Sequence, residues 1–159
     1  MIAHEPVKVA ATCGRCGAPV DSRYFDESGF ADVAPGARLV LARFELPRRF
    51  CGLLDFFAQF TDQYALNPAR VETPELDWSL VVNGYPLAPY GSFDRILNPW
   101  GFGSFETAIR LDDNAVLEFI VRVIGPPPAG LPAVTRIGGR IMGRYWYNDA
   151  CADVDRYRS

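Results

Sequence analysis

A regular alternation of apolar and polar residues, closed by an Asn-Gly pair, restricts the fold of this chain more than any other feature. Four apolar residues fall on one side of an extended segment: Leu76, Trp78, Leu80 and Val82. Successive residues of a strand point to opposite faces, so this spacing predicts a half-buried strand. Asn83 and Gly84 follow directly and tolerate the positive φ angles of a type I′ hairpin turn. Pro86 and Pro89 limit the second arm of that hairpin to a short strand.

The same period-two pattern recurs from residue 37 onward. Residues 37–46 place alternate apolar residues on one side, namely Val40, Ala42, Phe44 and Leu46. Residues 105–111 and 115–123 alternate in the same way around an Asp-Asp-Asn turn, which predicts a second hairpin. Its inward residues are Phe105, Thr107, Ile109 and Leu111 on one arm, and Ala115, Leu117, Phe119, Val121 and Val123 on the other. Residues 133–147 form the last strand region.

Residues 50–61 fit either a helix or a strand. Gly52 and four phenylalanines favour the strand, because both residue types are poor helix formers. The inward face of that strand would carry Phe50, Leu54, Phe56, Ala58 and Phe60. About seven or eight short strands with no long helix then predict two antiparallel sheets packed face to face. The expected fold is an all-β, jelly-roll-like sandwich.

Three segments are expected along the chain. Residues 1–36 read as an N-terminal arm, in which residues 21–36 form a loop. Residues 37–147 form the sandwich domain, and residues 148–159 form a polar C-terminal tail. The length of 159 residues, with 49% apolar and 22% charged residues, suits one globular domain.

Charge and hydropathy narrow the choice of partners. The net charge of −3 does not favour nucleic acid, which basic domains bind. No apolar run approaches the roughly 20 residues of a membrane helix, and the start of the chain does not resemble a signal peptide. We therefore expect a chain that is kept in a cytosol, or assembled there into something larger, without a membrane partner.

A C-x-x-C pair at Cys13 and Cys16 is the one motif typical of a metal site. Two thiolates on a tight turn can hold half of a structural zinc site. The remaining ligands would have to come from Cys51, Cys151 or His4. A disulfide or packed thiols remain alternatives, and no other cofactor is expected.

Catalytic groups are scarce. His4 is the one histidine, and a position so close to a chain end is poorly suited to holding a catalytic base. Asp112 and Asp113 are adjacent carboxylates, but they fall in a predicted turn, where aspartate is common. The sequence therefore does not predict an enzyme.

Arg136, Arg140 and Arg144 share one face of the last predicted strand, and Trp146 falls on the same side. These arginines could bind acidic groups of a neighbouring subunit. Alternatively, they form a solvated face that protects an edge strand from pairing.

The order of "RFELP", "DWSLVVNGYPLAPYGSF", "FETAIRLDDNAVLEFIVRV" and "TRIGGRIMGRYWY" resembles small jelly-roll proteins encoded among the virion genes of tailed bacteriophages. The resemblance covers residues 38–147. Such proteins decorate capsids, sit at vertices or build the neck and tail. The resemblance implies a non-enzymatic virion subunit that is assembled in the host cytoplasm, forms homo-oligomers and contacts other virion proteins.

The loop around residues 85–104 carries aromatic residues that no predicted strand explains: Tyr85, Tyr90, Trp100 and Phe102. Aromatic residues of this kind often anchor protein interfaces. Together with Arg136, Arg140, Arg144 and Trp146, they are the interface candidates. The alternative function is a carbohydrate-binding sandwich, in which the same rings would stack against sugars.

Overall fold

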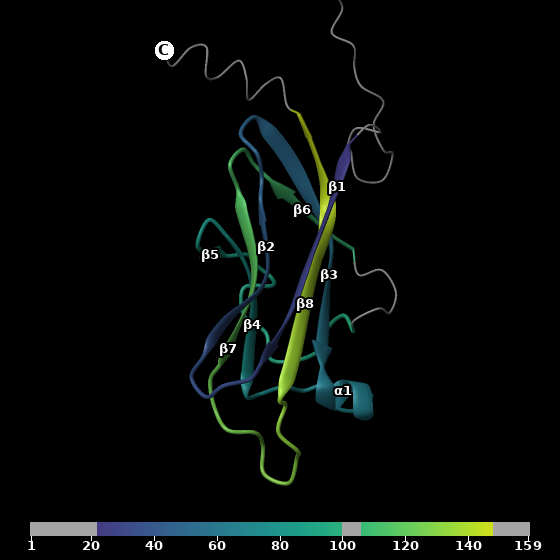
Figure 1. Cartoon of the computed structure of the whole chain (residues 1–159), viewed down its shortest axis with the longest axis vertical. Coiled ribbons are helices and arrows are strands. Elements are labelled where there is room, and N and C mark those ends of the chain that lie inside the picture. The colour runs from purple at the N-terminus through teal and green to yellow at the C-terminus, as the bar shows by residue number, and fades with distance from the viewer. Residues whose placement is uncertain (1–21, 100–105, 148–159) are drawn as a thin grey trace, which may run out of the picture.

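A computed structural model describes residues 22–99 and 106–147 of the chain. These residues form eight β-strands and one short helix (Figure 1). In chain order the elements are β1 (Arg23–Asp32), β2 (Arg38–Glu45), β3 (Phe50–Thr61), α1 (Asp62–Leu66), β4 (Leu76–Val82), β5 (Tyr85–Pro86), β6 (Glu106–Leu111), β7 (Val116–Val123) and β8 (Arg136–Tyr147).

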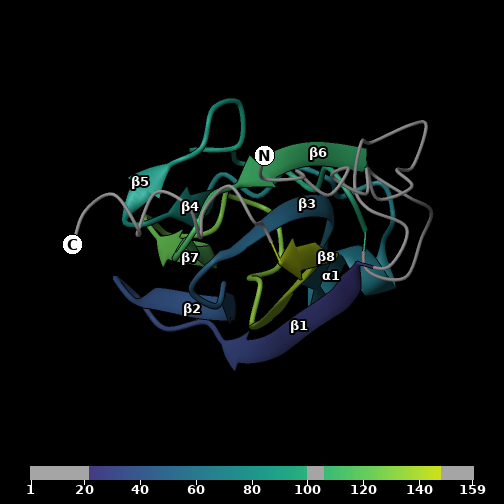
Figure 2. The same ribbon diagram turned by 90° about the horizontal axis from the view of Figure 1, so that it is seen from above.

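The strands lie in two antiparallel sheets, which confirms the predicted all-β sandwich. The first sheet has the order β1-β8-β3-β6, and the second has the order β2-β7-β4-β5. Figure 2 looks along the sandwich and shows the two layers side by side. β1 pairs with β8, β2 with β7, β3 with β6 and β4 with β5, so the chain is one long hairpin wrapped around the core. The jelly-roll form of the sandwich stays a prediction.

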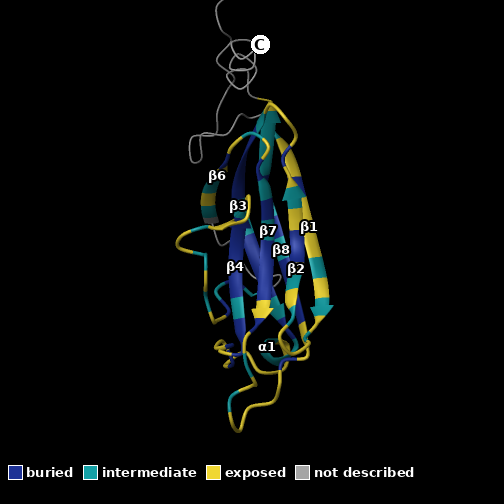
Figure 3. Cartoon of the chain, turned by 90° about the vertical axis from the view of Figure 1, so that its left-hand side faces the viewer, coloured by how far each residue is buried: buried dark blue, intermediate teal, exposed yellow. Residues whose placement is uncertain are grey.

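The core lies between the sheets and uses the alternation predicted from the sequence. On β4, Leu76, Trp78 and Leu80 are fully buried. Ala115, just before β7, is buried, and so are the alternate residues Leu117, Phe119, Val121 and Val123 of β7. Figure 3 shows β4 and β7 as largely buried strands. The indole N–H of Trp78 donates to the Thr73 hydroxyl over 3.0 Å, so the ring is buried without an unpaired donor.

The predicted Asn-Gly hairpin is also confirmed. Asn83 has a φ of 52° and Gly84 a φ of 82°, which are the positive angles that a type I′ turn requires. Val82 and Tyr85 face each other across the turn, and β5 ends after two residues at Pro86. The short second arm agrees with the effect expected of the prolines.

The predicted inward faces of β2 and β3 are wrong in part, because each strand contains a β-bulge. On β3 the register shifts between Leu54 and Phe56, so Leu54 and Phe57 are both fully buried in the core. Phe56 and Phe60, predicted inward, therefore point to the other side. On β2 a shift between Val40 and Ala42 leaves Val40 43% exposed. A bulge adds one residue to a strand and inverts the alternation after it.

Residues 21–36 were predicted as a loop, and this prediction is wrong. Arg23–Asp32 form β1, which pairs with β8 along its whole length. The sandwich therefore begins before the predicted boundary at residue 37. Phe25 of β1 is buried and stacks on Phe44 of β2, with 4.0 Å between ring centroids. Acidic residues and Gly29 conceal the alternation, but the inward position of Phe25 fixes the strand against the second sheet.

Candidate functional site

The outward side of the first sheet, here called the arginine face, is the main candidate surface. Ile137 and Ile141 of β8 are fully buried against the second sheet, so the alternate residues of this strand point outward. The face carries Tyr24, Asp26 and Phe30 from β1, Asp55, Phe56 and Phe60 from β3, and Arg136, Arg140, Met142, Arg144 and Trp146 from β8.

Two of the arginines are held by bidentate ion pairs within the sheet. Arg140 donates to both carboxylate oxygens of Asp26 on β1, over 2.8 and 2.6 Å. Arg144 donates to both oxygens of Asp55 on β3, over 2.9 and 3.1 Å. The hydrogen bond from Arg140 lowers the pKa of Asp26 below its ordinary value, although burial opposes this effect. The pairs fix both guanidinium groups across neighbouring strands.

The structure bears on both interpretations of the arginine row: contact with a neighbouring subunit stays a prediction, and the edge-strand interpretation is wrong. The acidic partners of Arg140 and Arg144 belong to this chain, so a neighbouring subunit is not needed to supply them. β8 pairs with β1 on one side and β3 on the other, so it is an interior strand and not the predicted edge strand. Asp26 and Asp55 were missed because they act across the sheet, from a segment predicted as a loop and from a β-bulge.

Aromatic rings surround the arginines on the same face. Phe30 and Phe60 lie on either side of Gly138 in the register, and their rings meet edge to face with centroids 5.3 Å apart. The guanidinium carbon of Arg136 lies 5.5 Å from the centroid of the Phe30 ring, within the range of a cation–π contact. Trp146 is opposite Cys51 in the register and is partly buried.

The predicted aromatic loop is only partly a surface. Tyr85 is 77% exposed on β5, at the far edge of the second sheet. Tyr90 is partly buried, and its ring lies 5.2 Å from the ring of the core residue Phe57. Trp100 and Phe102 lie outside the described residues. Of the two described candidates, Tyr85 alone presents most of its ring to solvent.

The predicted zinc ligands cannot be compared with one another in space. Cys13, Cys16, Cys151 and His4 lie outside the described residues, while Cys51 is buried on β3. Within residues 22–99 and 106–147, no three metal-ligating side chains come together. The structural zinc site therefore stays a prediction, which metal analysis of the purified full chain would test.

A pocket of about 640 Å³ opens at the end of the sandwich where β7 leads into β8. Hydrogen bonds join the β7–β8 loop to α1 and to Arg70, which follows α1 in the chain. The Gln63 side chain donates to the Ala133 carbonyl over 3.1 Å, and Arg70 donates to the Pro132 carbonyl. Asp62 accepts from the Thr135 hydroxyl over 2.6 Å and from its amide over 3.1 Å. These bonds fix one wall of the pocket.

The hydrogen bonds that Asp62 accepts make the stability of the protein depend on pH. Burial alone would raise the pKa of Asp62, but hydrogen bonds from the Thr135 hydroxyl and from backbone amides outweigh it, and the pKa lies below its ordinary value. Asp62 therefore stabilises the fold fully above the unfolded-state pKa of about 3.9, and this contribution is lost as the pH falls through the folded-state pKa. We expect Asp62→Asn to lose less stability than the parent protein between about pH 5 and pH 2.5. Thermal melts across this range would measure the difference, and equal losses would contradict the assignment.

By its fold, this protein is an antiparallel β-sandwich protein. No model of a known protein family matches this sequence, and no curated protein matches it either. None of the helices in the described part of the chain is long and apolar enough to cross a membrane.

Proposed function

We propose that this protein is a non-enzymatic structural subunit of a tailed-phage virion, which binds other virion proteins and its own copies through the arginine face. The composition of that face is the observation that supports the proposal. Tyrosine, tryptophan, phenylalanine, methionine and arginine are the residue types enriched in protein interfaces, and all five occur there. The phage setting comes from the sequence resemblance.

The geometry of the face also suits assembly. Tyr24 is 78% exposed and Phe30 is 48% exposed, so two aromatic rings reach solvent beside arginines that the sheet already holds in place. A side chain that is fixed before binding loses less conformational entropy in a complex. Many copies, each bound weakly, become firmly placed on a particle through multivalency.

Tyr24 and Tyr85 provide a matched pair of variants, because they have nearly equal exposure on opposite sheets. We expect Tyr24→Ser to weaken self-association or binding to particles by about tenfold or more, as loss of an interface aromatic does. Tyr85→Ser should bind like the parent protein. Sedimentation of the full chain, alone and with particles of the phage that encodes it, would measure both. Unchanged binding of Tyr24→Ser would remove the arginine face from the proposal.

The carbohydrate-binding alternative depends on the edge of the second sheet, where Tyr85 lies on β5. Of the two loop candidates that the structure describes, Tyr85 is exposed and could stack on a sugar, whereas Tyr90 packs against Phe57 in the core. A glycan array probed with the full chain separates the two functions. Specific glycan binding that is lost in Tyr85→Ser and kept in Tyr24→Ser would favour this alternative.

A further inference from the structure

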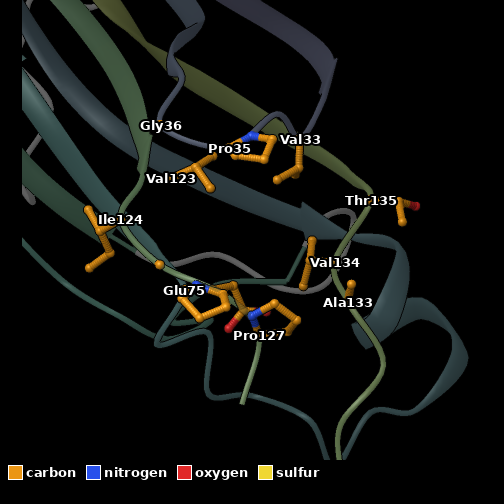
Figure 4. Close-up of a pocket in the computed structure, with 12 residues that line it drawn as sticks. Val33, Pro35, Gly36, Glu75, Val123, Ile124, Pro127, Ala133, Val134 and Thr135 are labelled. Atoms are coloured by element: carbon orange, nitrogen blue, oxygen red, sulfur yellow. The ribbon is translucent and has the colours of Figure 1, made fainter. Parts of the chain in front are cut away.

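We propose that the pocket between the β7–β8 loop and the turn after β1 binds an aromatic ring that carries one hydrogen-bond donor, such as an indole or a phenol. The pocket is separate from the arginine face, because none of its lining residues belongs to that face. Its volume of about 640 Å³ is within the range of small-ligand sites. Figure 4 shows the residues that line it.

The lining is mostly apolar and supplies flat surfaces for a ring. Three of the lining residues are prolines: Pro35 from the turn after β1, and Pro126 and Pro127 from the β7–β8 loop. Proline rings and aromatic rings pack well against each other in protein recognition. Val123 and Val134 are buried at the pocket, while Ile124 is 62% exposed at its edge.

One buried carboxylate provides the polar contact. The Glu75 side chain is only 4% exposed, and its Oε1 accepts from Arg70 Nη2 over 2.6 Å. Its second oxygen, Oε2, is buried and has no hydrogen-bond partner within the described part of the chain. A buried acceptor left unpaired destabilises the folded state, so a donor that reaches Oε2 gains a strong hydrogen bond. Glu75 and the exposed Pro127 both line the pocket, and Figure 4 labels both side chains.

The charge of this pair selects a neutral donor. Arg70 already neutralises Glu75, so an added cation would bring an unbalanced charge into the pocket. An N–H or O–H group satisfies Oε2 without changing the net charge. An anion is disfavoured, because the carboxylate lines the pocket and the guanidinium does not.

The walls are held in place by the backbone. Val33 donates to the Thr135 carbonyl over 2.9 Å, and Ile124 donates to the Glu75 carbonyl over 2.9 Å. With the contacts of Asp62, Gln63 and Arg70 to the β7–β8 loop, these bonds form the pocket before a ligand arrives. Such preorganisation lowers the cost of binding.

Titration of the full chain with indole, followed by amide shifts in NMR spectra, tests the proposal. Benzofuran is the matched control, because it has nearly the same shape and no donor. We expect saturable shifts at Val123, Ile124 and Thr135, and indole binding about tenfold tighter than benzofuran, as one hydrogen bond to a charged group provides. Equal affinities, or shifts elsewhere on the sandwich, would overturn the proposal.

Two further arms complete the experiment. Ile124→Lys changes the exposed edge of the pocket and should weaken indole binding without disturbing the core; unchanged binding would contradict the site. Glu75→Gln should reduce the preference for indole over benzofuran, provided that melting curves show a folded protein. A capped Gly-Trp-Gly peptide identifies the source of the ring. Tighter binding than free indole indicates a side chain of a protein partner, and weaker binding indicates a small molecule.

Discussion

Replacing Gly143 with alanine is expected to destabilise the sandwich by about 3 kcal/mol or more, as overpacking of a core does at its upper end. Gly143 lies on the inward side of β8, where a Cβ atom would be only 2.1 Å from the Leu53 carbonyl oxygen and 2.6 Å from the Phe25 ring. Leu53 belongs to the paired backbone of β3, and Phe25 is stacked on Phe44. Neither neighbour can move without breaking other contacts.

Gly125→Ala is the matched control for this substitution. No atom of the described residues lies within 4 Å of the position that its Cβ would occupy, and its φ is not in the left-handed region. Chemical denaturation of both variants, compared with the parent protein, should show a large loss for Gly143→Ala and a change within about 0.5 kcal/mol for Gly125→Ala. Similar midpoints for the two variants would show that β8 is not packed this closely.

The sequence predicts the parts of this fold that depend on simple alternation. β4 and β7 alternate without interruption, and their inward residues were identified correctly. β2 and β3 each contain a bulge, and nothing in their composition marks it. The bulge of β3 lies at Asp55, where the extra residue also turns a carboxylate toward Arg144. Local periodicity cannot reveal such a feature, because the bulge is defined by the pairing with β8.

For the candidate sites too, the sequence predicts which residues share a strand face but not which distant residues they contact. The sequence placed Arg136, Arg140 and Arg144 on one face, which the register of β8 confirms. It could not supply their partners, because Asp26 is 114 residues away from Arg140 in the sequence. The pocket was missed entirely. It is formed by turns and loops from distant parts of the chain, which carry no periodicity.

The buried ion pair between Arg70 and Glu75 is expected to show strong coupling between its two members. The side chains are 6% and 4% exposed, so removing one partner leaves a buried charge with little compensation. Arg70→Met and Glu75→Leu should each cost about 3–5 kcal/mol, whereas the double variant should recover most of that loss. Urea denaturation of the two single variants and the double variant gives the coupling energy directly.

The stability of the double variant also tests whether Glu75 serves ligand binding in the pocket. A buried ion pair is often no more stabilising than apolar residues of similar size, and here Arg70 Nε and Glu75 Oε2 both lack hydrogen-bond partners within the described residues. Stability alone is therefore a weak reason for a carboxylate at this position. A double variant that is at least as stable as the parent, but has lost the preference for indole, would tie Glu75 to ligand binding. If the double variant instead loses as much stability as the two single variants together, each side chain stabilises the fold independently of the other.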